Sequence, residues 1–189
     1  MADIDVLRVF ERESGKPKGA IKVKGATFLN GVSVGPDGNV YVSDSALEQW
    51  GPYMEPTGKD AIYRIEGGKK AVELIKDKAL GNPNGLATSA AGLWVVNKVG
   101  ELYLVGFDGS KQGVQKLPKG TLDGIVALPN GKIWVSSWDA KAVFERTGDS
   151  KFVPVVTKIA SPADIGYDAK RKRLLIPQLT EHSVRIQPL

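Results

Sequence analysis

A short motif recurs four times along this chain, and its spacing constrains the fold more than any other feature. In each copy a turn delivers an Asn or Asp to the start of an apolar, β-rich run, and a second apolar run follows within the same repeat. The four polar residues lie 54, 39 and 41 positions apart: Asn30, Asn84, Asp123 and Asp164. Self-similarity at a period of about 40 residues is typical of stacked-blade and solenoid architectures. We therefore expect equivalent side chains to gather around an axis.

Each repeat reads as four short antiparallel strands. In the third repeat the strands are expected at 124–128, 132–137, 141–146 and 152–157, with a Gly-containing hairpin turn at 129–132. A four-stranded unit of this length, with an aromatic residue at a fixed place in its second strand, is the pattern of a propeller blade. A β-sandwich is the alternative, but it does not require internal repetition. The predicted fold class is therefore all-β: a β-propeller of about four four-stranded blades.

The chain is expected to form a single propeller domain, 1–189. Its expected parts are the outer strands of an incomplete blade at 1–24, full blades at 25–80, 81–119 and 120–160, and an incomplete last blade at 161–189. The strand at 20–24 either completes the last blade or leaves an open arc. Unpaired strand edges invite pairing with another chain, so an open arc would favour self-association.

Composition excludes several classes of protein. The chain has no cysteine, which rules out disulfides, thiolate catalysis and Cys-ligated metals. Its net charge is +5, but the lysines are scattered through turns without a row of aromatic residues, so we expect no nucleic-acid partner. No apolar stretch reaches the ~18 residues of a membrane span, and the N-terminus lacks the pattern of a signal peptide. We therefore expect a soluble protein, and the sequence does not predict its cellular compartment.

The repeated polar residues should share one rim of the propeller. The first strand of a blade lines the central channel, and antiparallel pairing returns the end of the second strand to the face where the first began. The expected rim residues are the repeated polar residues and the second-strand ends: Asn30, Asn84 and Asp123, with Asp44, Asn97 and Trp138.

A long loop at 45–60 rises over that same rim in the first repeat. Its Trp50, Tyr53 and Met54 would form an apolar cover beside a polar centre, which is the usual make-up of a small-molecule site. We therefore expect this loop to act as a lid for a bound substrate.

The three in-phase residues predict a cation site. Asn30, Asn84 and Asp123 offer only oxygen ligands, which suit a hard divalent cation such as Ca²⁺ better than zinc. Together they carry one formal charge, so this set alone would hold calcium weakly. His182 is the single histidine and lies far from the motif, which disfavours a Ser-His-Asp triad. An Asx turn is the plain structural alternative for each Asn or Asp.

Asp164 is a second-rank candidate. Aligning Ile165 with Val32 places Ala163, and not Asp164, at the position of Asn30. We therefore expect Asp164 to lie one residue out of phase with the other three.

Taken together, these motifs resemble the SMP-30/gluconolactonase/LRE-like family. The resemblance extends over essentially the whole chain, and the runs that carry it are Phe-Leu-Asn at 28–30, Gly-Asn-Pro-Asn-Gly at 81–85, Leu-Asp-Gly at 122–124 and Ala-Asp-Ile-Gly-Tyr-Asp at 163–168. It implies a six-bladed propeller with one divalent cation, commonly calcium, in the channel and hydrolysis of sugar lactones or related esters.

The resemblance also implies roles for individual residues. Asn84 and Asp123 match the family's metal ligands, and Asn30 matches an Asn that binds metal or substrate. Asp123 also matches the residue proposed to accept the proton of the attacking water, while the metal polarises the lactone carbonyl.

The chain departs from the family pattern in two places. The family begins with a blade that carries a Glu ligand, and nothing here matches it, so roughly one and a half N-terminal blades are lacking relative to that pattern. Gly31 stands where relatives often carry an Asp. The expected site therefore keeps a single carboxylate from the in-phase set.

Two functions follow as hypotheses. The first is a metal-dependent lactone or ester hydrolase acting on a small molecule, either complete or as the larger piece of one that is inactive alone. The second is a non-enzymatic propeller that binds a small ligand or a protein on the same rim. In either case further blades could come from elsewhere.

Overall fold

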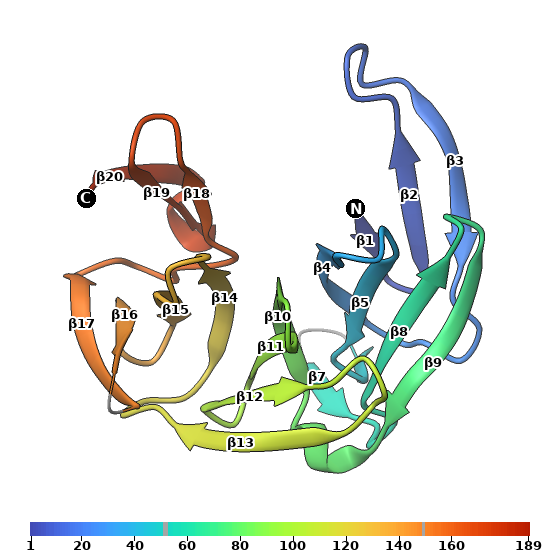
Figure 1. Ribbon diagram of the computed structural model, residues 1–189, viewed down its shortest axis with the longest axis horizontal. Coiled ribbons are helices and arrows are strands. Elements are labelled where there is room, and N and C mark those ends of the chain that lie inside the picture. Colours follow the sequence, from blue (N-terminus) through green and yellow to red (C-terminus); the bar gives the residue numbers. More distant parts are fainter. Residues whose placement is uncertain (51–52, 149) are drawn as a thin grey trace.

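The computed structural model of the protein describes residues 1–50, 53–148 and 150–189. Antiparallel sheets stand side by side in an arc, as the blades of a propeller do (Figure 1). The structure is all-β apart from two short 3₁₀ helices, η1 (Lys78–Leu80) and η2 (Leu179–Glu181), which confirms the predicted fold class. Within those described ranges, no helix has both the length and the apolar character needed to cross a membrane.

Three blades have four strands each, and in all three the strand order follows the chain. They are β4 (Leu29–Val34), β5 (Val40–Asp44), β8 (Ala61–Glu66) and β9 (Lys70–Lys76); β10 (Pro83–Ser89), β11 (Gly92–Asn97), β12 (Glu101–Val105) and β13 (Lys111–Lys116); and β14 (Leu122–Ala127), β15 (Ile133–Ser137), β16 (Ala142–Thr147) and β17 (Lys151–Thr157). The strands of the third blade lie within two residues of their expected bounds. The first strand of each of these blades is innermost, so β4, β10 and β14 lie along the inner side of the arc (Figure 1).

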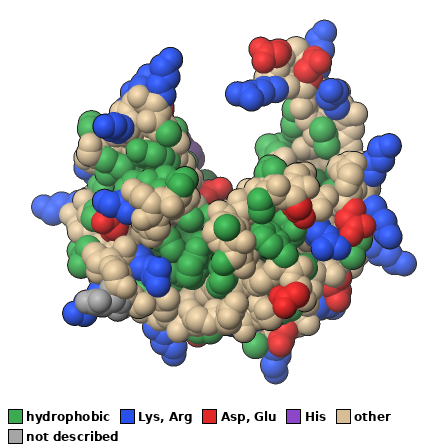
Figure 2. All heavy atoms as spheres, viewed as in Figure 1, with side chains coloured by type: hydrophobic (Ala, Val, Ile, Leu, Met, Phe, Trp, Pro, Cys, Tyr) green, Lys and Arg blue, Asp and Glu red, His purple; other side chains and the backbone are tan. Residues whose placement is uncertain are grey.

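The blades at the two ends have three strands each. They are β1 (Ala2–Asp3), β2 (Val6–Phe10) and β3 (Pro17–Lys22) at the start, and β18 (Gly166–Asp168), β19 (Arg173–Gln178) and β20 (Ser183–Pro188) at the end. β1 is too short to carry a periodic pattern, which is why the sequence did not predict it. β3 pairs with β2 in its own sheet, and a gap separates the first and last blades (Figure 2). Of the two arrangements anticipated, the structure shows the open arc.

The long loop of the first repeat folds in part into a hairpin over the rim. β6 (Leu47–Trp50) pairs with β7 (Tyr53–Pro56), and Gln49 lies opposite Met54. The described part of the expected lid therefore contains a two-stranded element, and residues 51 and 52 lie outside the described residues.

Apolar side chains from neighbouring blades interlock between the sheets. Leu102 of the second blade packs in one cluster with Ile125 and Phe144 of the third. The aromatic residue of the second strand belongs to these clusters, since Tyr41 is fully buried and Trp134 nearly so. The repeated aromatic position is thus a core position.

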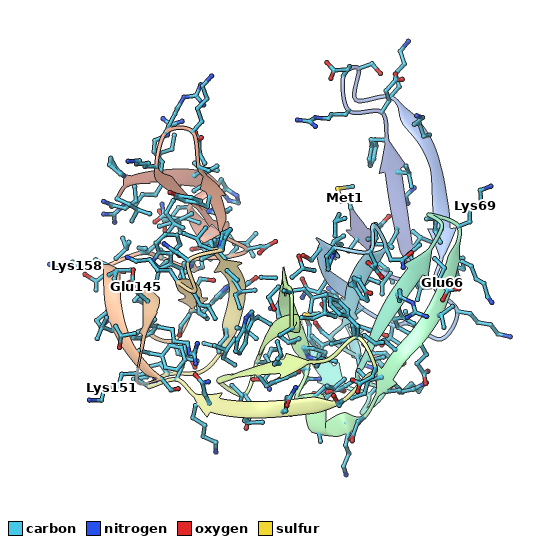
Figure 3. All side chains as sticks on the ribbon, in the orientation of Figure 1. Met1, Glu66, Lys69, Glu145, Lys151 and Lys158 are labelled. Atoms are coloured by element: carbon cyan, nitrogen blue, oxygen red, sulfur yellow. The ribbon has the colours of Figure 1, made fainter. Side chains whose placement is uncertain are left out.

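Basic side chains are spread around the outside of the arc. Lys69, Lys151 and Lys158 point away from its centre at widely separated places (Figure 3). This distribution is that of an ordinary solvated surface.

Neighbouring inner strands approach each other closely at three glycines, each of which follows a repeated polar residue. A Cβ at these positions would overlap a backbone atom of the next blade: Asn84 O for Gly31, Asp123 O for Gly85 and Ile165 N for Gly124. Any side chain here would push the inner strands apart. The glycine is therefore required by the spacing of the blades.

A serine hydroxyl bridges the same contact. The Gly31 N–H donates to Ser43 Oγ at 2.9 Å, and Ser43 Oγ donates to the carbonyl oxygen of Asn84 at 2.5 Å. Ser136 occupies the equivalent position in the third blade and makes the equivalent bonds. These buried bonds hold neighbouring inner strands in register.

Gly124→Ala is expected to lower the free energy of unfolding by about 2 kcal/mol or more, because the added methyl group overlaps backbone and not a movable side chain. Gly148→Ala is the matched control, since a Cβ there meets nothing within 4 Å. We expect the control to change stability by less than about 0.5 kcal/mol. Denaturant unfolding of both variants checks this; equal losses would contradict the role given to the inter-blade contact.

Candidate functional site

A cavity of about 340 Å³ lies on the rim beneath the hairpin, and three blades contribute to its wall. Its lining residues are Phe28, Asn30, Leu47, Met54, Asn84, Lys98, Thr121, Asp123 and Trp138. The structure therefore brings Asn30, Asn84 and Asp123, which are far apart in the sequence, to one place. Met54 of the hairpin and Trp138 join them.

The three polar residues occupy the same irregularity in their blades. Each is the second residue of an inner strand, where the pairing with the next strand shifts register. The shifts fall between Leu29 and Val32, between Pro83 and Leu86, and between Leu122 and Ile125. Such β-bulges redirect side chains and are frequent beside functional sites. The repeated bulge explains why these side chains reach the cavity while their neighbours follow the sheet.

Hydrogen bonds hold these side chains and leave one oxygen of each available. Asn30 Nδ2 donates to Ser45 Oγ at 3.2 Å, and Asn84 Nδ2 donates to the Leu122 carbonyl at 3.3 Å. Trp138 Nε1 donates to Asp123 Oδ2 at 2.9 Å. No donor from the described part of the chain reaches the Oδ1 atom of Asn30, Asn84 or Asp123. Three oxygen ligands thus remain free for a bound group.

Asp123 is electrostatically unusual. Desolvation in the cavity raises the pKa of its carboxyl group to about 6; the Trp138 hydrogen bond opposes this rise, and the charge of Asp164 adds to it. A carboxylate with a pKa near neutrality is suited to accept a proton during catalysis.

Asp164 lies one residue out of phase, as expected. Ser136 donates to the carbonyl of Ala163 at 2.8 Å, just as the equivalent serine of the first blade donates to that of Asn84, so Ala163 takes the in-phase position. Part of the Asp164 side chain is open to water, but surrounding protein still raises the pKa of its carboxyl group by desolvation. Asp164 does not line the cavity, and it acts on Asp123 through its charge.

Two of the predicted rim residues, Asp44 and Asn97, are fully buried, and their side chains form hydrogen bonds with nearby backbone groups. The Asp44 carboxylate accepts hydrogen bonds from the backbone N–H groups of Thr27, Phe28 and Ala46. Asn97 accepts the Glu101 N–H and donates to the Leu80 carbonyl. The structure does not bring either to the cavity.

The aromatic residues of the hairpin lie beside the cavity and not in its wall. Trp50 lines a neighbouring hollow of about 390 Å³ together with Phe28 and Leu47, which belong to both hollows. Tyr53 is 69% exposed. Of the three lid residues expected, only Met54 lines the cavity itself.

Lys98 and Thr121 line the cavity but were not predicted as site residues. Lys98 directly follows Asn97, so the rule that selected second-strand ends missed it by one position. Thr121 precedes Leu122 at the start of the third repeat and carries no repeat signal of its own. A comparison of equivalent positions across the blades would have found Lys98.

The available ligands fit a hard cation better than a transition metal. In the described residues no three His, Cys, Asp or Glu side chains gather closely enough to hold a metal ion. The free oxygens are two amides and one carboxylate, which are the donor types that Ca²⁺ accepts alongside backbone carbonyls and water. A cation would also offset the cost of leaving the Asp123 carboxylate desolvated.

Comparisons by sequence return nothing: no protein-family model and no curated protein matches the chain. Comparisons of structure do find similar propellers. A gluconolactonase from Xanthomonas campestris shares 20% identity with a TM-score of 0.69, over 90% of this chain and 61% of that one. A second protein, whose structure is described as that of a "putative gluconolactonase", shares 23% identity with a TM-score of 0.70, over 98% of this chain and 70% of that one.

A virginiamycin B lyase from Staphylococcus aureus is also similar, with 15% identity, a TM-score of 0.64, and coverage of 98% of this chain and 64% of that one. With 61% of the Xanthomonas gluconolactonase covered, the chain spans less than two thirds of the length of that protein. At these identities the likeness establishes the fold. The protein has the β-propeller fold seen in gluconolactonases and in virginiamycin B lyase.

Proposed function

We propose that this site hydrolyses a small lactone or ester with the help of a divalent cation, and that the cation is Ca²⁺. The observation that carries the proposal is the convergence of Asn30, Asn84 and Asp123 on one cavity, each with an unused Oδ1 atom. A solitary Asx turn would not place its oxygen in phase with two others. The gluconolactonases among the similar structures support the choice of reaction.

The residues of the chain divide the chemistry between them. Asn30, Asn84 and Asp123 would hold the cation through their Oδ1 atoms, and the bound cation would supply Lewis-acid polarisation of the substrate carbonyl. Asp123 accepts the proton of the attacking water, and Trp138 fixes the orientation of its carboxylate. The water oxygen forms a bond to the carbonyl carbon, and the acyl C–O bond of the ring breaks. The leaving ring oxygen takes the proton that Asp123 had accepted, which gives a hydroxy acid and restores the Asp123 carboxylate.

Apolar side chains form part of the cavity wall and would shield a bound substrate from water where they touch it. They include Met54 and Leu47 of the hairpin and Phe28. A cavity of about 340 Å³ falls at the lower end of the 300–1,000 Å³ usual for small-molecule sites. This favours a substrate of roughly one ring with short substituents.

A non-enzymatic binding role on the same rim is the second candidate. It is favoured by the low negative charge of Asn30, Asn84 and Asp123, because one carboxylate and two amides alone would hold calcium weakly. The outer edge of β20 pairs with no further strand in the described part of the chain, so a protein partner or a second copy could add a strand there. Ligand binding that is insensitive to chelator, without turnover of any lactone, would favour this candidate.

Asp123→Asn is expected to reduce lactone hydrolysis about 100-fold or more, because it removes both the proton acceptor and the charged cation ligand. Chelation of Ca²⁺ should have a similar effect on the parent protein. Asp139→Asn is the matched control, since Asp139 is an exposed carboxylate near the same rim that does not line the cavity. Equal turnover by the Asp123→Asn variant and the control would contradict the proposal.

Trp138→Phe tests the positioning of the carboxylate. The lost indole N–H leaves Asp123 Oδ2 without its donor, so kcat should fall about tenfold while KM changes less. The same hydrogen bond lowers the pKa of Asp123, so the acidic limb of the pH–rate profile should move to higher pH in the variant. A loss of activity with an unchanged pH profile would indicate a purely structural role for Trp138.

The metal-free protein should show a pH-dependent stability that depends on Asp123. A raised carboxyl pKa means that the folded state holds this proton more tightly, so stability falls as the pH rises from about 4 to about 6 and then levels off. Asp123→Asn should remove this fall, which amounts to at most roughly 3 kcal/mol. Unfolding of both proteins with chelator across this range, and again with Ca²⁺ at pH 7, checks it. Parallel curves for the two proteins would contradict the assignment.

A further inference from the structure

Lys98 occupies the same place in the second blade as Ser45 and Trp138 do in the first and third. Each of the three is the residue immediately after the last paired position of the second strand. The backbone N–H of each donates to the residue that lies two positions before the repeated Asn or Asp. These bonds are Ser45 to Phe28 at 2.9 Å, Lys98 to Asn82 at 3.3 Å and Trp138 to Thr121 at 3.0 Å.

In two of the blades this residue contacts the polar residue of its own blade. Ser45 Oγ accepts from Asn30 Nδ2, and Trp138 Nε1 donates to Asp123 Oδ2. In the second blade the equivalent Asn84 bonds instead to the Leu122 carbonyl. Lys98 lines the cavity, and its ammonium group forms no hydrogen bond or ion pair with any residue that the structure describes. In the first and third blades the side chain at this position therefore bonds to the protein, whereas in the second blade the Lys98 ammonium group does not.

Lys98 is half-buried in the cavity wall, and its ammonium group has no partner among the residues that the structure describes. An ammonium group in this position can bind a negatively charged group of a ligand. The proposed divalent cation would add to the positive charge of the same cavity. Lys98 and Asp123 are the charged side chains in the cavity wall, and no ion pair between them is found in the described residues. The proposed cation would take the Asp123 carboxylate, which leaves the Lys98 ammonium group for a negatively charged group of the ligand.

We infer that the substrate of this cavity is a small lactone that carries a carboxylate, and that Lys98 binds this carboxylate. The inference rests on the proposed function and narrows its substrate class. A carboxylate can pair with a single ammonium donor, and one ring that carries a carboxylate suits a cavity of about 340 Å³. Lys98 is thus a specificity residue and takes no part in the proton transfer.

Matched lactones separate this role from catalysis. We would compare 5-oxotetrahydrofuran-2-carboxylate with γ-valerolactone, in which a methyl group replaces the carboxylate on the same ring. The ratio of their kcat/KM values should favour the acid in the parent protein and fall about tenfold or more in Lys98→Gln, the usual size of a lost charge-assisted hydrogen bond. Lys98→Arg should restore much of the preference. Lys119→Gln, which removes an exposed lysine near the same rim, should keep the parent ratio.

Binding of non-hydrolysable lactams tests the inference independently of turnover. In calorimetry with Ca²⁺ present, 5-oxopyrrolidine-2-carboxylate should bind the parent protein more tightly than 5-methyl-2-pyrrolidinone, and Lys98→Gln should abolish the difference. Equal effects of Lys98→Gln on the charged and neutral ligands, or no effect on either, would overturn the inference while leaving the hydrolase proposal intact. Lys98-dependent binding of the charged lactam without turnover of either lactone would instead support the anion site and contradict the hydrolase.

Discussion

Direct contact between the backbones of neighbouring inner strands is the constraint on which the rest of the structure depends. Gly31, Gly85 and Gly124 carry no side chain, so each strand approaches until it touches the next blade beside its own repeated residue. This approach fixes the rotation from one blade to the next. It also fixes where the preceding Asn or Asp must lie, because that residue is the chain neighbour of the glycine.

The same dipeptide therefore serves the fold and the candidate site. The glycine sets the contact between blades, and the bulge at this point directs the Asn or Asp toward the channel. Since the bulge recurs in the three four-stranded blades, three oxygen-bearing side chains that are far apart in the sequence line one cavity. The desolvated Asp123 is a consequence of this geometry, and a bound cation would offset its cost.

Much of the fold and of the candidate site could be predicted, because the spacing of a repeat can be read directly from the sequence. The blades, the in-phase set Asn30, Asn84 and Asp123, and the offset of Asp164 all follow from it. The rim was harder to predict, because side chains one residue apart at the end of the second strand have different surroundings. Asp44 and Asn97 are the last paired residues and turn inward, whereas Lys98 and Trp138 come one residue later and line the cavity. The two-residue strand β1 also left no pattern to detect.

Crystals of the protein soaked with Mn²⁺, as an anomalous stand-in for Ca²⁺, offer the most direct test of the cation site at the centre of this account. We expect a single strong anomalous peak in the cavity, with the Oδ1 atoms of Asn30, Asn84 and Asp123 all within about 2.6 Å of it. An empty cavity at millimolar Mn²⁺, or a peak bound only by other residues, would contradict the account.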